Sequence, residues 1–179
     1  MADRARESAR GVASAPLCDL GLIAENVVDT HQLSPEAYVR HVDADLPRHP
    51  LLVRGHADDV ASLVASAIEC VARWPGVNRR IVVSARLVGE RVELLVVHGS
   101  TASVHPSVPM SLDELGRCGD ASFESLRQHM LRLLMRLGAT LVAGRDAALD
   151  GLALSIVFPG VSGAPLHRPY RKASGGRPS

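Results

Sequence analysis

The chain has 179 residues, of which 46% are hydrophobic, and its formal net charge is +1. This length fits one domain with tails, the apolar fraction is enough for a core, and the near-neutral charge gives no basic footprint for nucleic acid or an anionic membrane. No apolar run reaches the roughly 20 residues of a membrane span, and the charged N-terminus is not followed by a signal-peptide core. We therefore expect a cytoplasmic protein. Its three widely spaced cysteines are expected to be reduced thiols.

The N-terminal part begins with a predicted disordered tail, residues 1–15, in which polar and small residues show no periodicity. A short helix is predicted at Asp19–His31, with Asp19 as its possible cap and Pro35 as its breaker. Tyr38–Leu46 then alternates as a strand. The residues on one of its faces are Tyr38, Arg40, Val42, Ala44 and Leu46.

A short apolar strand at Leu51–Val53 leads through Gly55 into an amphipathic helix at Asp58–Arg73. Asp58 or Asp59 can cap the start of this helix by accepting a backbone N–H, and Trp74-Pro75-Gly76 ends it. Helical spacing predicts that one face is buried. That face consists of Val60, Leu63, Val64, Ala67, Ile68 and Val71.

A β-hairpin follows, with strands at Ile81–Leu87 and Val92–Val97 and a turn at Gly89-Glu90. Its inward residues are predicted to be Ile81, Val83, Ala85, Leu87, Val92, Leu94 and Val96. The second strand ends at His98-Gly99-Ser100. The long connection 100–120 has few apolar anchors, so we expect it to be the most mobile internal segment, with one possible helical turn at Leu112 and Leu115.

The C-terminal part begins with a second amphipathic helix at Ser122–Leu137, capped by Ser122 and ended by Gly138. Its apolar face consists of Leu126, Met130, Leu133, Leu134 and Leu137. Strands at Ala139–Ala143 and Leu152–Phe158 close the domain, which we place at 16–159, and residues 160–179 are predicted to be a disordered tail. This order of elements predicts an α+β two-layer sandwich with the helices on one face of a mostly antiparallel sheet.

The helix, turn and hairpin of Asp58–His98 resemble the ATP-binding domain of bacterial sensor histidine kinases, the GHKL or HATPase group. The resemblance extends over about Leu17 to Pro159. A Gly-Asp-x-x-x-Leu step often leads into that domain, and Gly55-His56-Ala57-Asp58-Asp59 occupies its place here. The resemblance implies a Mg-ATP site built from a helix side chain that holds Mg²⁺, a strand-end carboxylate that binds adenine, and glycine-rich loops around the phosphates.

The helix motif of that family, Asn-Leu-Leu-x-Asn-Ala, matches Ser66-Ala67-Ile68-Glu69-Cys70-Val71. Ser66 and Cys70 therefore take the two asparagine places, and a neutral thiol is a poor Mg²⁺ ligand. Glu69 is a possible replacement ligand, although it lies about 100° around the helix from Cys70. We expect Glu69 to be solvated instead.

Both glycine-rich motifs are also altered. Asp-x-Gly-x-Gly is replaced by His98-Gly99-Ser100-Thr101-Ala102, and we expect His98 to be a half-exposed strand-end histidine. Gly-x-Gly-Leu-Gly-Leu would fall at 119–126, where only Gly119 and Leu126 match. Phe123 adds bulk there, and the carboxylates of Glu124, Asp120 and Asp113 would repel a triphosphate.

We therefore expect a degenerate histidine-kinase-type ATPase domain without kinase activity, catalytic residues, metal or cofactor. It would act by binding a bacterial signalling protein: a kinase, a response regulator or a sigma-factor regulator. Two alternatives stay open. One is a diverged but active ATP-binding kinase of the histidine or anti-sigma type, and the other is a small-molecule sensor that reuses the pocket. The vestigial pocket is predicted to comprise Ser66, Glu69, Cys70, His98, Ser100, Gly119, Ser122 and Ser125.

Overall fold

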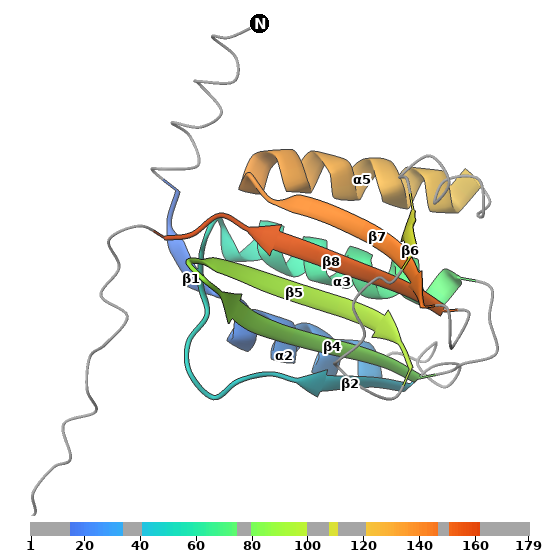
Figure 1. The fold of residues 1–179 in the computed structure, drawn as a ribbon, viewed down its shortest axis with the longest axis horizontal. Coiled ribbons are helices and arrows are strands. Elements are labelled where there is room, and N and C mark those ends of the chain that lie inside the picture. The colour runs from blue at the N-terminus through green and yellow to red at the C-terminus, as the bar shows by residue number, and fades with distance from the viewer. Residues whose placement is uncertain are drawn as a thin grey trace, which may run out of the picture.

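The computed structural model describes residues 15–33, 41–74, 80–99, 108–110, 121–146 and 151–161. Most of the two predicted tails, and most of the predicted mobile connection 100–120, lie outside these residues. Figure 1 shows the described elements as a sheet with helices behind it.

The main sheet of the described chain has six strands in the order β2-β4-β5-β8-β7-β6. Its strands are β2 (His41–Asp45), β4 (Arg80–Val88), β5 (Arg91–His98), β6 (Val108–Met110), β7 (Thr140–Asp146) and β8 (Gly151–Phe158). All neighbours pair antiparallel except β2 and β4, which pair parallel. The predicted mostly antiparallel sheet is therefore confirmed, and β6 is an addition inside the connection at 100–120.

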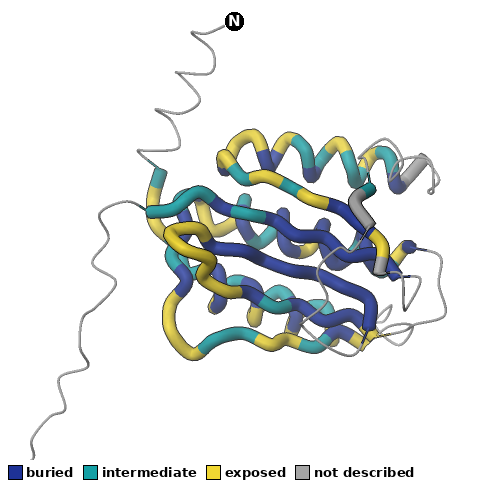
Figure 2. Tube along the Cα trace, in the orientation of Figure 1, coloured by how far each residue is buried: buried dark blue, intermediate teal, exposed yellow. Residues whose placement is uncertain are grey.

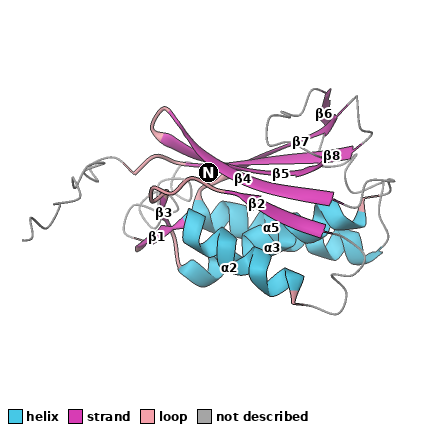
Figure 3. Cartoon of the chain, turned by 90° about the horizontal axis from the view of Figure 1, so that it is seen from below, coloured by secondary structure: helices cyan, strands magenta, loops and turns pink. Residues whose placement is uncertain are grey.

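Three described helices, α2 (Leu20–Gln32), α3 (Ala57–Arg73) and α5 (Ala121–Leu137), cover one face of this sheet (Figure 3). The α+β two-layer sandwich predicted from the sequence is thus confirmed. Helices α3 and α5 pack side by side, as predicted. Arg136 forms an ion pair with Asp59 at 2.9 Å, and Ser62 lies 2.9 Å from His129 in a hydrogen bond.

None of the described helices has both the length and the apolarity of a membrane-spanning helix.

The core lies between the helices and the sheet. All six predicted inward residues of α3 have no exposed surface, and Met130, Leu133, Leu134 and Leu137 of α5 are buried against them. The hairpin also has its predicted register, with Gly89 at φ 62° in the turn. Leu87 is the exception on the inward face, because it lies near the turn and is exposed.

The opposite face of the sheet is also apolar at its centre. Val82, Leu95, Val97 and Ala153 form a second buried cluster, and Figure 2 shows the central strands as buried along most of their length. Strands that are buried on both faces lose the clear alternation of a half-exposed strand. Only one of the two faces was predicted from the pattern.

A separate small sheet pairs β1 (Leu17–Asp19) with β3 (Leu52–Arg54), and β1 was not predicted. Asp19 connects it to α2. One carboxylate oxygen of Asp19 accepts from the N–H of Gly21 at 3.0 Å, as predicted for a cap, and from the N–H of Leu51 at 3.1 Å. This single side chain therefore fixes both the start of α2 and the entry into β3.

Two other predicted helix caps are wrong. Helix α3 starts with His56 as its N-cap, which makes no side-chain cap bond, so Asp58 and Asp59 lie inside the first turn. There they favour the helix through its dipole rather than as caps. Helix α5 already includes Ala121, so Ser122 is a helical residue and not the residue before the helix.

Candidate functional site

The candidate site lies where the C-terminal end of α3, the end of β5, the start of β8 and the start of α5 come together at one end of the molecule (Figure 1, right). Two tight turns at the opposite end of the molecule set the directions of these elements. The Gly89-Glu90 turn reverses the hairpin at the far end of the sheet, and Gly138, at φ 62°, reverses the chain from α5 into β7 at that same far end. The candidate site is therefore opposite both turns.

The two α3 positions that correspond to the asparagines of the resembled family are both buried. Ser66 is 6% exposed and Cys70 is 1% exposed. Burial raises the pKa of the Cys70 thiol from 9.0 to about 12, and the nearby negative charge of Glu69 adds to the effect. At neutral pH Cys70 is thus a protonated thiol, whereas metal ligation by cysteine requires the thiolate.

Glu69 lies on the surface rather than beside Cys70 in the core. Its carboxylate accepts a hydrogen bond from Arg73, one helical turn further along α3, and both side chains are about half exposed. This is an ordinary surface ion pair. The placement agrees with the expectation that Glu69 is solvated.

His98 ends β5, at the position that the resemblance assigns to the adenine-binding carboxylate, and it is buried. It is only 2% exposed, so the expectation of a half-exposed histidine is wrong. The backbone N–H of Leu152 donates to its Nδ1 at 3.4 Å, which places the proton of a neutral ring on Nε2. The ring is held so closely that a Cβ added at Gly151 would lie 2.7 Å from the Cβ of His98.

The sequence did not indicate this burial because it depends on β8. Nothing in the sequence shows why residue 151 is a glycine. In the structure Gly151 is the first residue of β8, and its missing side chain leaves room for His98. Glycine at a point of close approach is the one signal that could have shown the contact.

At the start of α5, Phe123 is buried and Glu124 carries a permanent negative charge. Hydrogen bonds from Arg127, at 2.7 and 2.8 Å, and from Gln128 lower the pKa of Glu124 to about 2. Ser125 is exposed on the same helix. Ser100, Gly119 and the side chain of Ser122, which complete the predicted pocket, lie outside the described residues.

A residue pair that sequence reasoning missed joins the end of α3 to β7. The guanidinium carbon of Arg145 lies 5.4 Å from the centre of the Trp74 ring, in a cation–π arrangement. Trp74 is the only tryptophan of the chain and is 2% exposed. The sequence pattern indicates only that Trp74 lies where the helix ends.

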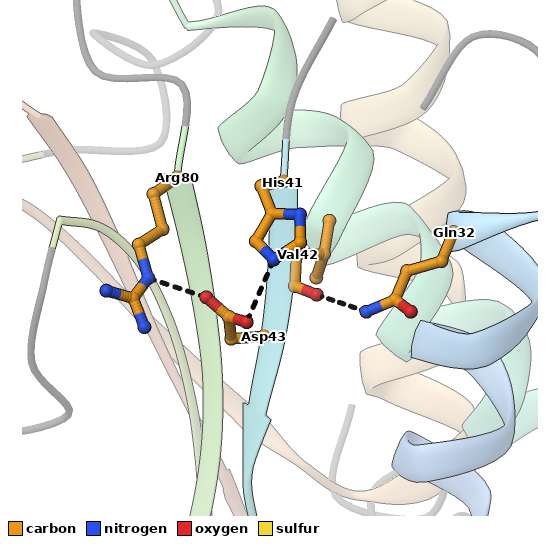
Figure 4. Close-up of polar contacts among 5 residues, drawn as sticks. All are labelled: Gln32, His41, Val42, Asp43 and Arg80. Carbon is orange, nitrogen blue, oxygen red and sulfur yellow. Dashed lines mark hydrogen bonds and ion pairs between the residues drawn. The ribbon is translucent and has the colours of Figure 1, made fainter. Parts of the chain in front are cut away.

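An exposed polar cluster lies near this end of the sheet, at the starts of β2 and β4 (Figure 4). Asp43 accepts from Arg80 at 2.5 Å and lies 3.2 Å from His41, while the amide of Gln32 donates to the carbonyl of Val42 at 2.7 Å. The last bond caps a backbone acceptor of the edge strand with a side chain from α2. Within the described ranges, no group of three His, Cys, Asp or Glu residues is placed to hold a metal ion.

The sequence matches no model of a known protein family, and no curated protein is significantly similar to it. The structure, however, is similar to solved sensor histidine kinases. A mycobacterial sensor histidine kinase, MprB, superposes with a TM-score of 0.59 at 17% identity, covering 82% of this chain and 97% of that one. The nucleotide-free catalytic domain of histidine kinase ThkA gives 0.59 at 10% identity, with 81% and 95% covered.

The ATP-binding domain of PrrB from Mycobacterium tuberculosis gives a TM-score of 0.55 at 18% identity, covering 83% of this chain and 99% of that one. In each case nearly the whole solved domain is matched, and the matched part includes most of this chain. At such low identities the similarity concerns the fold. This chain has the GHKL, or HATPase, fold of the ATP-binding catalytic domains of sensor histidine kinases.

Proposed function

We propose that this protein is a degenerate histidine-kinase-type ATPase domain, which lacks kinase activity and acts by binding a protein partner in bacterial signal transduction. The observation that carries the proposal is the state of Cys70. It is a buried, protonated thiol on α3, at a position where the family has an asparagine. Mg²⁺ prefers hard oxygen ligands in an octahedral arrangement, and a neutral thiol does not supply one.

His98 supports the same conclusion at the adenine end. The carboxylate of the family would accept a hydrogen bond from the adenine amine, whereas Nδ1 of His98 already accepts one from the backbone of Leu152. The Nε2–H of a neutral ring is a donor. A neutral imidazole in this state has no free acceptor for the adenine amine, so His98 does not replace the carboxylate.

The third element is the negative charge at the start of α5. A helix N-terminus normally favours a phosphate, but Glu124, whose pKa is lowered to about 2 by Arg127 and Gln128, is ionised at neutral pH. Its pairing with Arg127 leaves no net positive charge at this turn. We infer that the site has lost metal, base and phosphate recognition separately.

The size of the expected loss follows from the interactions removed. Each charge-assisted hydrogen bond contributes about 1.5–3 kcal/mol, and two or three of them would be missing. Since 1.4 kcal/mol is a factor of ten, a micromolar dissociation constant would rise roughly 10³-fold or more. The dissociation constant would then be about millimolar or higher, near or beyond cellular nucleotide levels.

Calorimetric titration of the full chain with Mg-ATP tests the proposal. We expect no saturable binding up to about 1 mM, and the same result for Met135→Ala, an exposed control on α5 outside the predicted pocket. A combined Ser66→Asn, Cys70→Asn and His98→Asp variant, checked for folding by its melting curve, should gain measurable affinity. Low-micromolar binding or hydrolysis by the unaltered protein would instead support the active-kinase alternative.

The partner is expected to be a signalling protein, such as a kinase, a response regulator or a sigma-factor regulator. Affinity capture from the native lysate, followed by mass spectrometry, should recover such a protein. Tight binding of a metabolite without any protein partner would favour the small-molecule sensor.

A further inference from the structure

A pocket of about 250 Å³ lies beside the end of β2, on the face of the sheet away from the helices. Strand β2 ends at Asp45, whereas its neighbour β4 continues towards its turn with β5 (Figure 1). The chain leaves the sheet through Leu46 and Pro47, so a step forms at the sheet edge. The floor of this step includes Ser84 of β4 and Leu95 of β5, which are paired with each other.

The charged residues of the lining are Asp45, Arg86 and Glu93. Glu93 is 8% exposed, and its carboxylate accepts from the hydroxyl of Ser155 at 2.6 Å and from Nε of Arg86 at 2.8 Å. The charges of Arg86 and Glu93 therefore compensate each other. Asp45 is exposed, and no described residue forms an ion pair with it. The lining thus has one net negative charge, which is located at Asp45.

The size of the pocket limits what it can hold. Pockets for drug-sized ligands have roughly 300–1,000 Å³, whereas this one is smaller and has room for about one long side chain. Arginine and lysine carry their charge at the end of an apolar stem. Such a side chain would place its charged group beside Asp45 and its stem against Leu46 and Leu95. The lining therefore favours a basic side chain of a peptide segment.

The chain itself contains a segment of this kind, residues 162–179, which follows the described part of β8. It has four basic residues, Arg168, Arg171, Lys172 and Arg177, and no acidic one. The other 161 residues contain 16 basic and 19 acidic residues, which is a net charge of −3. The segment and the rest of the chain are therefore complementary in charge.

The described chain also ends near the pocket. Strand β8 runs towards the end of the molecule that holds the β4–β5 turn (Figure 1), and Gly160 lies so close to the carbonyl oxygen of Glu90 in that turn that a Cβ would not fit. Ser84 is about 13 Å along β4 from the turn. Arg168 is seven residues beyond Val161, a length of chain that spans up to about 25 Å. The basic residues are therefore within reach of the pocket.

We propose that the basic segment 168–172 of this chain binds in the pocket at the end of β2, with an arginine or lysine side chain beside Asp45. Attachment to β8 gives the segment an effective concentration in the millimolar range, which favours it over the same segment of a second copy. The pocket is on the sheet face away from the helices, whereas Cys70 belongs to the core under them. The inference is therefore independent of the proposed function.

The probe is a fluorescein-labelled peptide with the sequence of residues 162–179, titrated into two full chains by fluorescence anisotropy. One chain is unaltered. The other, the neutralised chain, carries Arg168→Gln, Arg171→Gln, Lys172→Gln and Arg177→Gln, which remove the competing basic side chains. The peptide should bind the neutralised chain about tenfold more tightly, because a tethered segment at about 1 mM competes with a peptide whose dissociation constant is about 0.1 mM.

Asp45→Lys, introduced into the neutralised chain, is the blocking variant and should weaken peptide binding at least about tenfold. Asp29→Lys makes the same charge change at an exposed position of α2 outside the pocket, so it is the matched control and should leave the affinity unchanged. Asp45→Asn keeps the shape of the side chain and should weaken binding about threefold. Melting curves establish that each variant is folded.

Equal effects of Asp45→Lys and Asp29→Lys on the peptide affinity, or no binding of the peptide to the neutralised chain, would overturn the proposal. Equal affinity of the peptide for the unaltered and the neutralised chain would also overturn it. If that binding still depended on Asp45, the pocket would belong to a basic segment of another molecule. A dimer of the unaltered chain in sedimentation, which Asp45→Lys dissociates, would identify that molecule as a second copy.

Discussion

The helix–sheet interface and the end of the layer that holds the candidate site differ in the chemistry of their buried side chains. The interface has an uninterrupted apolar surface, with α3 and α5 packed on the sheet. The site end contains Ser66, Cys70 and His98, and all three are buried. Stability is concentrated in the interface, where apolar area is removed from water, so the site residues can change while the fold persists.

Two side chains at the site end are part of the packed interior. Cys70 behaves as a small hydrophobic residue. It belongs to the same core cluster as the apolar face of α3. His98 keeps its polarity but bonds to the backbone of β8. The region thus contributes packing to the domain.

The largest effect that tests this division is expected from Leu134→Ala in α5. Leu134 is 5% exposed in the core, so its truncation should lower the free energy of unfolding by about 2–5 kcal/mol. Its neighbour Met135 is 69% exposed, and Met135→Ala should change the stability by less than about 0.5 kcal/mol. Denaturant unfolding measures both variants. Equal effects would show that the inward face of α5 is misassigned.

Gly151→Ala tests whether the site end is as tightly packed as the core. The added Cβ would lie 2.7 Å from the Cβ of His98, so β5 and β8 must move apart. We expect a loss of about 1–3 kcal/mol, measured by denaturant unfolding. Combining it with His98→Gly, which removes that Cβ, should give less than the sum of the two single effects. Strict additivity would contradict the contact.

The pH dependence of stability tests the state of Cys70. The pKa of its thiol is raised from 9.0 to about 12 in the folded protein, so the unfolded chain loses this proton first as the pH rises. Between pH 9 and 12 this group should therefore lower the free energy of unfolding by about 1.4 kcal/mol per pH unit. Below pH 9 it has no effect.

Cys70→Ala provides the control for this measurement, because it removes the titrating group and keeps a small apolar side chain. Its stability should decline less steeply above pH 9 than that of the unaltered protein. Identical slopes in thermal or urea unfolding would mean that Cys70 ionises equally in both states and is accessible to water.

The smallest effect is expected at Glu124, on the surface of α5. Its pKa is lowered from 4.5 to about 2, so its contribution is present above pH 4.5 and is lost as the pH falls towards 2. Glu124→Gln should remove this part of the acid dependence, and because the side chain is on the surface and screened by solvent, its effect on the stability at neutral pH should be the smallest of the changes tested here. Nuclear magnetic resonance titration of the carboxyl would measure the pKa directly, and a value near 4.5 would refute the pairing with Arg127.

The sequence by itself determined the amphipathic helices, the hairpin and the two-layer class. Their signals are local: the 3.6-residue period in α3 and α5, the alternation in β4 and β5, and the glycines at positions 89 and 138. The assignment of Ser66, Cys70 and His98 to the motif positions of the resembled family also comes from the sequence, because it depends on their spacing along these elements, and it stays a prediction.

Only the tertiary structure decided which residues far apart in the chain meet. The burial of His98 depends on β8, the cap at Asp19 also serves β3, and Arg145 stacks on Trp74 across the fold. The short strands β1 and β6 likewise exist through pairing with distant partners. A local period reports which face of an element is apolar, but not which element covers it, because burial is a property of the assembled layers.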